Sequence, residues 1–195
     1  MKLYFHPLSR AATTLWMFAE LEAPYESVVL DFTAGESSTP EYRAINPMGK
    51  VPALVDGDVV VTETAAICAY LADQFADRGL APAIESKARG AYYRYLFFPG
   101  TTLEPALTLA QLEVELENPG SVGWGDVTRV LATIEAMTPL TEWAIGEKFT
   151  TADVVFGGTL DSGIRFGWLE PSAKVMAYVE RLRERPAYKE SHPGW

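Results

Sequence analysis

The sequence is poor in the residues from which disulfides and metal centres are built. Its 195 residues include one cysteine, Cys68, and two histidines, His6 and His192. A lone cysteine excludes a disulfide within this chain, and two distant histidines do not have the spacing of a metal-ligand cluster. We therefore expect no metal site. We also expect Cys68 to be a small buried apolar residue and not a nucleophile.

Basic residues and long apolar runs are also scarce. Lys and Arg total 16 against 26 Asp and Glu, and the formal net charge is -10 at pH 7. A chain of this charge without a dense basic run is not expected to bind nucleic acid. No segment approaches the ~20 apolar residues of a membrane-spanning helix, and the first ten residues lack the apolar stretch of a secretion signal. We expect a soluble, cytoplasmic protein without a membrane partner.

The first part of the chain alternates between strand and helix patterns. Residues 2–6 alternate in polarity, with Leu3 and Phe5 on one face, which is typical of a short strand. Apolar residues then recur at helical spacing over residues 12–19, and a second strand pattern covers residues 25–30. A strand, a helix and a strand of this length predict a βαβ unit with two parallel strands.

A hairpin and a helix complete this first domain. Asp56-Gly57 separates two β-rich runs, 52–55 and 59–62. Asp-Gly between such runs is the strongest short-range signal of a hairpin, because both central positions of the turn need positive φ. An amphipathic helix pattern follows over residues 66–75. A βαβ unit, a hairpin and a helix together predict a thioredoxin-like α/β domain with a four-stranded mixed sheet over residues 1–78.

Two stretches are expected to lack regular structure. Residues 31–50 contain Pro40 and Pro47, which should limit helices and strands there. Residues 79–85 begin with Gly-Leu-Ala-Pro and are expected to form a linker. The linker marks the boundary between two domains.

The remainder of the chain carries helix patterns and no convincing strand pair. The expected helices cover residues 86–116, with a break at Pro99-Gly100, and residues 126–137, 151–164 and 175–184. They predict an all-helical second domain over residues 86–195. Thr150 and Asp153 have the spacing of a capping box at a helix start, so we expect Asp153 to serve folding and not chemistry.

The most specific motif spans residues 46–54, NPMGKVPAL, followed by Asp56-Gly57 and by residues 62–67, TETAAI. This pattern resembles the signature of cytosolic glutathione transferases. Residues 149–153, FTTAD, resemble the Phe-Ser/Thr-x-Ala-Asp capping motif of the same family, and residues 177–188 resemble its C-terminal helix ending. The chain is therefore similar to bacterial-type, theta/phi-like members along essentially its whole length. The resemblance implies a thioredoxin-like domain followed by an all-α domain.

The resemblance also implies which residues hold glutathione, a tripeptide with two carboxylates, an ammonium group and a thiol. Val51, before Pro52, would offer its backbone to the cysteinyl part as an added strand does, and in the family the bond before this proline is cis. Glu63 and Thr64 would bind the γ-glutamyl end at a helix start, and Lys50 the glycyl carboxylate. The structural alternatives are an edge strand begun by Pro52, caps of a helix at Glu63 and Thr64, and a solvated surface lysine.

Three residues compete for the role of stabilising the glutathione thiolate. A free thiol is mostly protonated at neutral pH, so a donor or a cation must favour the anion. Ser9, between the first strand and the first helix, is similar in position to the serine of theta-like members, although an ordinary N-cap is an equal alternative. Tyr4 resembles the strand-end tyrosine of pi-like members or simply packs, and Arg10 could supply positive potential. The first loop lacks a cysteine, which argues against the classes that form a mixed disulfide.

Taken with the family resemblance, these residues imply an enzyme that transfers the glutathione thiolate to a small, mostly apolar electrophile. Glutathione is then the co-substrate, no metal is required, and a homodimer is implied by the family. Candidates for lining the electrophile pocket are the aromatic residues within 92–98, with Trp124, Phe166 or Trp168 as remoter choices. Two alternatives remain open: glutathione-dependent reduction of peroxides or disulfides, and a non-catalytic binding module of the same fold.

Overall fold

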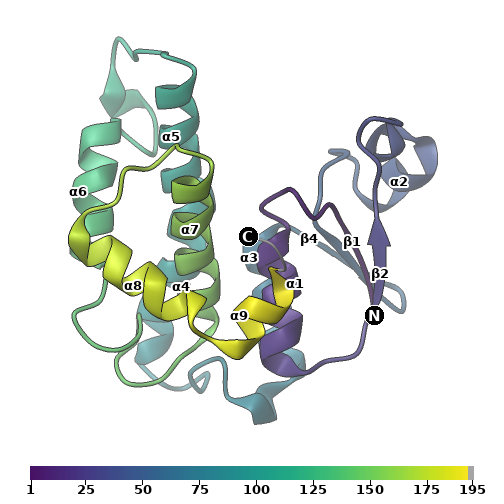
Figure 1. Cartoon of the computed structure of the whole chain (residues 1–195). Helices are drawn as coiled ribbons and strands as arrows, with labels where there is room; N and C mark the ends of the chain where they lie inside the picture. Colours follow the sequence, from purple (N-terminus) through teal and green to yellow (C-terminus); the bar gives the residue numbers. More distant parts are fainter. Residues whose placement is uncertain (193–195) are drawn as a thin grey trace. The chain divides into compact units, whose positions relative to one another are not determined.

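The computed structural model describes residues 1–192 and contains two compact units (Figure 1). The first unit joins residues 1–78 to the segment that begins at Pro186, and the helical unit comprises residues 79–185. The C-terminal segment therefore differs from the prediction, which assigned everything from residue 86 onward to the second domain. It belongs with the first unit because α9 (Pro186–Ser191) packs against α1 (Ala12–Leu21).

A four-stranded mixed sheet forms the centre of the first unit. Its strands are β1 (Lys2–Phe5), β2 (Glu26–Val29), β3 (Ala53–Asp56) and β4 (Val59–Thr62), in the spatial order β2-β1-β3-β4. β1 pairs with β2 in parallel and with β3 antiparallel, and β3 pairs with β4 across the hairpin. Gly57 has the positive φ of 58° that the turn requires. The predicted thioredoxin-like arrangement is confirmed.

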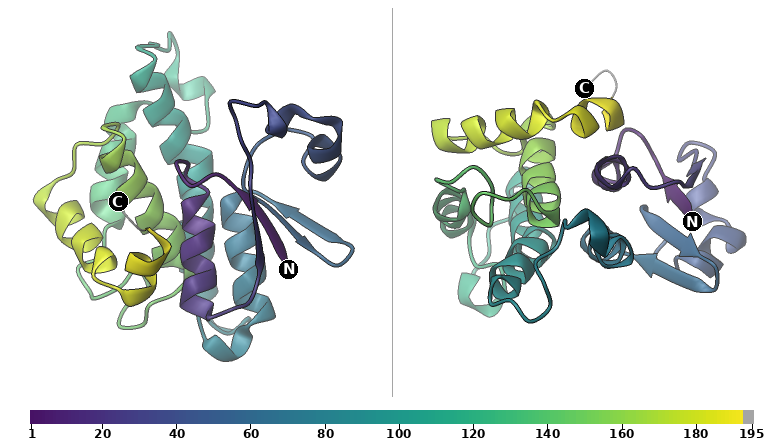
Figure 2. Two further views of the ribbon diagram at one scale, coloured as in Figure 1. Left: turned by 45° about the vertical axis from the view of Figure 1, so that its right-hand side comes forward. Right: turned by 90° about the horizontal axis from the view of Figure 1, so that it is seen from below.

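The two faces of the sheet are covered by different helices. Leu3 and Phe5 are buried, and Figure 2 shows α1 and α3 (Thr64–Gln74) side by side on one face, with α2 (Pro40–Ile45) on the other. Tyr4 alternates to the α2 face, where it packs against a small core of Leu30, Tyr42 and Ala53. The strict alternation of strand side chains thus separates Tyr4 from its two buried neighbours.

Helix α2 corrects the prediction that residues 31–50 are irregular. Thr39 is its N-cap, with a side-chain oxygen that accepts from the Tyr42 backbone N–H, and Pro40 occupies the first turn. Proline is well tolerated there, because its missing N–H has no helical partner and its φ already suits a helix. Thr39-Pro40 therefore begins a helix and does not interrupt one.

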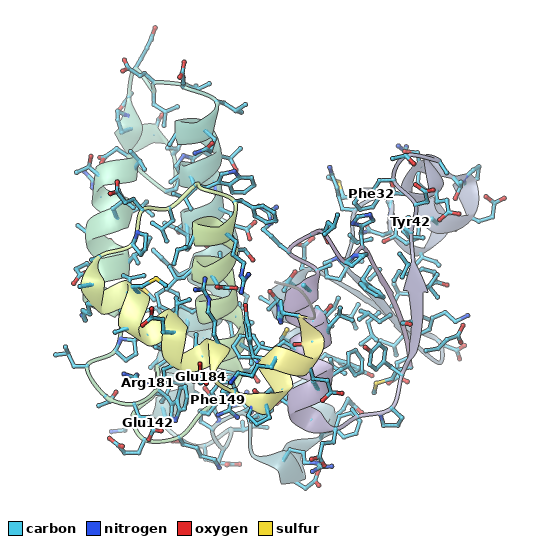
Figure 3. The ribbon with its side chains drawn as sticks, viewed as in Figure 1. Phe32, Tyr42, Glu142, Phe149, Arg181 and Glu184 are labelled. Carbon is cyan, nitrogen blue, oxygen red and sulfur yellow. The ribbon has the colours of Figure 1, made fainter. Side chains whose placement is uncertain are left out.

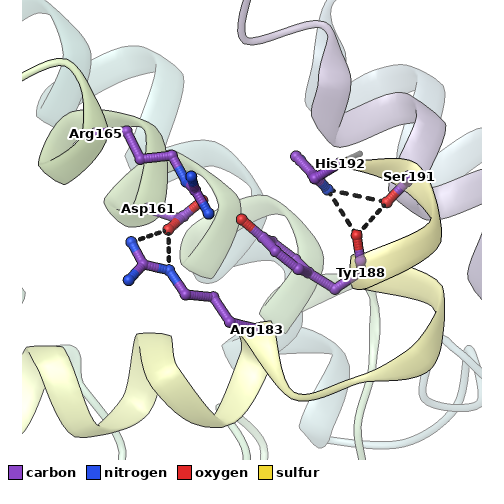
Figure 4. Close-up of polar contacts among 6 residues, drawn as sticks. All are labelled: Asp161, Arg165, Arg183, Tyr188, Ser191 and His192. Atoms are coloured by element: carbon purple, nitrogen blue, oxygen red, sulfur yellow. Dashed lines mark hydrogen bonds and ion pairs between the residues drawn. The ribbon is translucent and has the colours of Figure 1, made fainter. Parts of the chain in front are cut away.

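Helix α9 attaches the C-terminal segment to α1 through aromatic rings. Tyr188 meets Trp16 edge-on with ring centroids 5.1 Å apart, and His192 stacks on Tyr188 at 4.2 Å. The His192 Nδ1 atom lies 3.1 Å from the Tyr188 carbonyl oxygen and 3.0 Å from the Ser191 hydroxyl (Figure 4). These contacts give His192 a structural role in closing the end of the chain onto α1.

The helical unit contains five α-helices within residues 79–185: α4 (Ala88–Phe98), α5 (Glu104–Gln111), α6 (Val127–Met137), α7 (Gly158–Arg165) and α8 (Ala173–Arg183). Pro99 does not break the first of them, since a π-helical turn over Pro99–Leu103 carries the chain from α4 into α5. α5 ends at Gln111, earlier than the predicted Leu116, and Glu113 then adopts a φ of 54°. None of the helices over residues 1–192 combines the length and apolar character needed to cross a lipid bilayer.

The predicted linker is anchored in the helical unit. Leu80 is 8% exposed, and its carbonyl oxygen accepts from the backbone N–H of Thr151 at 2.8 Å and from its hydroxyl at 3.0 Å. The start of the unit is thereby attached to the segment that leads into α7. Leu80 is therefore part of a packed core and not of a free connection.

Two buried carboxylates organise the helical unit. Asp153 shows the predicted capping box: Thr150 Oγ1 accepts from the Ala152 N–H, and Asp153 accepts from the Thr150 N–H at 3.0 Å. Asp161, which the sequence analysis did not single out, pairs with Arg165 at 2.8 Å and with Arg183 at 2.6 Å (Figure 4). Paired in this way, the Asp161 charge is compensated inside the protein.

Candidate functional site

The register of the sheet brings three predicted site segments to one end of it. Tyr4 pairs with Ala53, and Ala53 pairs with Thr62. Because β3 runs antiparallel to both of its neighbours, the end of β1, the beginning of β3 and the end of β4 lie together. The turn after β1 that holds Ser9, the Val51–Pro52 bond and the Glu63–Thr64 pair all extend from this end of the sheet.

The Lys50–Pro52 segment is held in place by two side chains from α2 and its end. The Lys50 carbonyl oxygen accepts from the Tyr42 hydroxyl at 2.6 Å and from the Asn46 side-chain amide at 2.7 Å. Tyr42, labelled in Figure 3, is 4% exposed. The Val51–Pro52 bond is cis, and the ladder pairs of β3 begin only at Ala53. Val51 therefore lies outside the paired part of the strand.

The backbone conformation of the loop requires glycine at position 49. Its φ is 62°, and a Cβ atom at this position would lie 2.7 Å from the Ser37 carbonyl oxygen. A side chain would be strained and would also collide with backbone, so the loop requires glycine here. Tyr42, Asn46 and Gly49 were not predicted as site residues, although Asn46 and Gly49 stand in the motif that pointed to the site.

Glu63 and Thr64 form the start of α3. Glu63 has φ 69° and ψ 125°, and no side chain caps the first turn of the helix. A residue other than glycine at such angles costs about 1–3 kcal/mol, and such residues cluster at functional sites. Uncapped N–H groups at a helix start attract anions. Within residues 1–192 neither the Thr64 hydroxyl nor the Lys50 ammonium has a hydrogen-bond or ion-pair partner.

Ser9 caps the turn between β1 and α1. Its hydroxyl donates to the His6 carbonyl oxygen at 2.7 Å and accepts from the Ala11 N–H at 3.2 Å. The His6 ring stacks on Phe32 with centroids 4.4 Å apart, and its Nδ1 atom accepts from the Leu8 N–H. The turn is thus built by local hydrogen bonds, and the half-buried Ser9 hydroxyl lies four residues beyond the end of β1.

Tyr4 and Arg10 have different surroundings. The Tyr4 ring lies 5.6 Å from the Tyr42 ring, within the small core on the α2 face of the sheet. This is the packing role that was one of the two interpretations of Tyr4. Arg10 directly follows Ser9 and is half-buried. It adds a positive charge next to Ser9 in the sequence, in a chain whose net charge is negative.

The surroundings of Cys68 suppress the reactivity of its thiol. Cys68 is fully buried in α3, and burial raises the pKa of its thiol far above the ordinary value. A thiol in this state is not nucleophilic. Among residues 1–192, no group of three or more His, Cys, Asp or Glu side chains is arranged to hold a metal ion.

The predicted aromatic residues of the helical unit separate into two sets. Tyr92 is buried, and the Tyr95 hydroxyl donates to the Met137 carbonyl oxygen at 2.7 Å. Tyr93 and Phe97 are 45% and 61% exposed on α4, with ring centroids 6.4 Å apart. The first set serves the core, and the second forms an exposed apolar surface.

Removing the Tyr42 hydroxyl tests whether its hydrogen bond stabilises the Lys50–Pro52 segment. Tyr42→Phe removes one of two donors to the Lys50 carbonyl oxygen and should lower the free energy of unfolding by about 0.5–1.5 kcal/mol. Burial raises the pKa of Tyr42 to about 12, above the ~10 of an exposed tyrosine. The folded protein therefore keeps this phenol neutral where the unfolded chain ionises it, and the resulting stabilisation, present below pH ~10, is lost between pH ~10 and ~12.

The measurement is urea unfolding of both proteins at about pH 8 and about pH 11. At the higher pH the wild type should lose about 1.4 kcal/mol relative to Tyr42→Phe, so its stability advantage should vanish or change sign, because phenylalanine has no proton to lose. The contribution of the tyrosines that do not contact Tyr42 is the same in both proteins and cancels in the comparison. A difference that stays constant between the two pH values would contradict this account of Tyr42.

Comparisons with known proteins all identify glutathione transferases as similar to this chain. Residues 1–73 match the family model of the "Glutathione S-transferase, N-terminal domain". Glutathione S-transferase 3 of Zea mays is 31% identical, over 98% of this chain and 92% of that protein. A Phanerochaete chrysosporium glutathione transferase in complex with oxidized glutathione has a TM-score of 0.80 at 28% identity, covering 97% and 93% of the two chains. A sphingomonad glutathione S-transferase complexed with glutathione has a TM-score of 0.79 at 27% identity, covering 98% and 97%.

Proposed function

Because this chain belongs to the glutathione transferase family, we propose that it activates the glutathione thiol and transfers it to small, mostly apolar electrophiles. The observation that carries the proposal is the convergence of the Ser9 turn, Val51–Pro52 and Glu63–Thr64 at one end of the sheet. Each segment offers a different chemistry: a hydroxyl, a backbone edge and an uncapped helix start. Glutathione has a group to match each of them: a thiol for the hydroxyl, a peptide backbone for the backbone edge and a γ-glutamyl carboxylate for the helix start.

The tripeptide would bind along this end of the sheet. Val51 lies outside the paired part of β3, so its backbone can pair with the cysteinyl part of the ligand as an added strand does. The first turn of α3 and the Thr64 hydroxyl would receive the γ-glutamyl carboxylate, with Glu63 at the ammonium group. Lys50 would pair with the glycyl carboxylate. Tyr42 and Asn46 support this arrangement indirectly, since they hold the Lys50 carbonyl oxygen.

The thiolate would be stabilised by the turn after β1. Ser9 supplies a hydroxyl and Arg10 a positive charge, and both favour the anionic form of a nearby sulfur. The Ser9 hydrogen now points to the His6 carbonyl oxygen, and donation to the sulfur requires the hydroxyl to rotate. A hydroxyl rotates freely enough to do so. Tyr4 is the weaker candidate, because it packs in the core on the α2 face.

The electrophile would contact apolar surface of the helical unit. The exposed Tyr93 and Phe97 rings provide such a surface, and aromatic rings are common in sites for apolar ligands. We propose in addition that the protein acts in the cytoplasm as a homodimer, as the family resemblance implies.

Turnover of three substrate types tests the reaction. With glutathione present, we expect conjugation of chlorodinitrobenzene to be faster than reduction of an organic hydroperoxide or of a small disulfide. Faster reduction would replace the proposal by glutathione-dependent peroxidase or reductase chemistry. Calorimetric binding of glutathione without turnover of any of the three would indicate a binding module.

Thr64→Ala tests how glutathione is held. Removing one hydrogen bond to a carboxylate should weaken glutathione binding by about 1–3 kcal/mol, or about 5- to 150-fold. Thr64→Ser is the matched control, because it keeps the hydroxyl and should retain affinity within about twofold of the wild type. Titration calorimetry measures all three proteins. An unchanged affinity in folded Thr64→Ala would mean that the γ-glutamyl end binds elsewhere.

A further inference from the structure

The turn between β1 and α1 is attached at two points to a single residue, His6. The Ser9 hydroxyl donates to the His6 carbonyl oxygen at 2.7 Å, and the Leu8 N–H donates to the His6 Nδ1 atom at 3.2 Å. Pro7, which lies between His6 and Leu8, has no N–H of its own to donate. His6 therefore accepts from this short turn through both its main chain and its side chain.

The side-chain bond of His6 has the geometry of an Asx turn. In such a turn an asparagine or aspartate oxygen accepts from the backbone N–H two residues further on, and here the His6 Nδ1 atom accepts from the Leu8 N–H in the same way. An imidazole accepts at Nδ1 when it is neutral and carries its hydrogen on Nε2. The Leu8 side chain is 74% exposed, so Leu8 contributes its backbone N–H to the turn and not its side chain.

The His6 ring is held by a stack on Phe32, which lies in the loop after β2 (Figure 3). The two ring centroids are 4.4 Å apart and the ring planes are inclined by 15°. The loop has hydrogen bonds of its own, since the Asp31 Oδ1 atom accepts from the backbone N–H groups of Thr33 at 2.8 Å and of Ala34 at 3.1 Å. The stack therefore limits the rotation of the His6 ring and keeps its Nδ1 atom directed at the turn.

The position of the Ser9 oxygen depends on this turn. Its Oγ atom is held by the His6 carbonyl oxygen and by the Ala11 N–H at 3.2 Å. When the hydroxyl rotates to donate to a sulfur, it gives up the His6 carbonyl oxygen. The bond from the Leu8 N–H to His6 then still ties the turn to the end of β1. A donor that is already in place when the anion forms stabilises it without reorganisation.

We propose that His6 is a positioning residue: its Nδ1 atom holds the Leu8 N–H and thereby places the Ser9 hydroxyl for donation to the glutathione sulfur. The stack on Phe32 fixes the ring that does this. The inference rests on the proposed function of Ser9, because His6 acts on the thiolate only through that hydroxyl. Loss of His6 should therefore change the ionisation of bound glutathione and leave its affinity nearly unchanged.

His6→Phe keeps a ring for the stack on Phe32 and removes the acceptor. The thiolate absorbance of bound glutathione should titrate about 0.5–1 pH unit higher, and turnover near neutral pH should fall about 3- to 10-fold, less than in Ser9→Ala because the hydroxyl is retained. Glutathione affinity, measured by calorimetry, should stay within about twofold of the wild type. His6→Asn restores an acceptor for the Leu8 N–H and should bring the titration back to that of the wild type. Leu8→Ala keeps the N–H and should leave the titration unchanged.

A double variant tests whether His6 acts through Ser9. In the Ser9→Ala protein, His6→Phe should cause no further shift of the thiol titration, because residues that act through one another are not additive. The role of His6 alone is overturned if His6→Phe shifts nothing in the wild-type background, if it shifts the titration equally in both backgrounds, or if His6→Asn is as impaired as His6→Phe. If Ser9→Ala itself leaves the titration unchanged, the proposed role of Ser9 fails and that of His6 fails with it, so the two failures are distinguishable.

Discussion

Ser9→Ala is expected to lower turnover near neutral pH by about 10- to 100-fold while glutathione affinity changes little. The hydroxyl is the only one in the turn between β1 and α1, and we propose that it donates to the sulfur of bound glutathione. Loss of a hydrogen bond to an anion raises the pKa of the bound thiol by about one to two units. Each unit reduces the thiolate fraction about tenfold at a pH below that pKa.

The thiolate itself provides the decisive measurement. Its ultraviolet absorbance, followed against pH in the enzyme–glutathione complex, should titrate at higher pH in Ser9→Ala than in the wild type. At a pH well above both values, the two proteins should approach the same turnover. Calorimetry should show that glutathione still binds, because Val51, Glu63 and Thr64 are unchanged.

Control variants distinguish the effect of the Ser9 hydroxyl from the effects of Tyr4 and Arg10. Ser9→Thr keeps the hydroxyl and should retain most of the activity, whereas Tyr4→Phe removes the competing hydroxyl and should have little effect. Ser9 also accepts from the Ala11 N–H, so thermal unfolding must show that Ser9→Ala is folded. If Tyr4→Phe shifts the thiol titration and Ser9→Ala does not, the role belongs to Tyr4. If neither shifts it, backbone donors or Arg10 hold the thiolate.

Asp153→Ala is expected to lower the free energy of unfolding by about 3–5 kcal/mol, more than an ordinary helix cap contributes. Its carboxylate is fully buried. It accepts from the Ala144 N–H at 2.7 Å, from the Thr150 N–H at 3.0 Å and from the Tyr178 hydroxyl at 2.9 Å. Alanine would leave these donors unpaired in a region from which water is excluded.

Asp126→Ala is the matched control, since Asp126 also caps a helix but is partly exposed and receives one backbone N–H. It should cost only about 0.5–2 kcal/mol. In thermal unfolding, Asp153→Ala should lower the Tm by roughly 6–20 °C, from ~2–4 °C for each kcal/mol in a chain of this size. Glutathione affinity in the folded fraction should stay close to that of the wild type. Lost affinity with an unchanged Tm would show instead that Asp153 belongs to the site.

Most of the candidate site residues could be proposed from the sequence because they stand in short, contiguous motifs. Lys50, Val51 and Pro52 lie within NPMGKVPAL, and Glu63 and Thr64 follow the hairpin that Asp56-Gly57 marks. Tyr42 was not predicted because its role depends on α2, which lies in a segment where Pro40 and Pro47 were expected to prevent a helix. Its hydroxyl reaches the Lys50 carbonyl oxygen only once α2 has formed and packed against the sheet.

The sequence by itself determined the family, the order of the four strands along the first unit with the helices α1 and α3, and the identity of the candidate glutathione residues. These follow from local patterns: two-residue alternation in strands, helical spacing, turn residues and a contiguous motif. The same local reasoning identified Thr150 and Asp153 as a capping box. It could not show that Asp153 also accepts from Ala144 and Tyr178, which are distant in the chain.

Only the tertiary structure decided which distant residues share an environment. It attached α9 to α1, because Tyr188 finds Trp16 there, and it paired Asp161 with Arg165 and Arg183. It also buried the Trp124 indole nitrogen without a hydrogen-bond partner among residues 1–192. The physical reason is common to all three. Burial, ion pairing and hydrogen-bond satisfaction depend on contacts between residues far apart in the sequence, and no local pattern encodes those contacts.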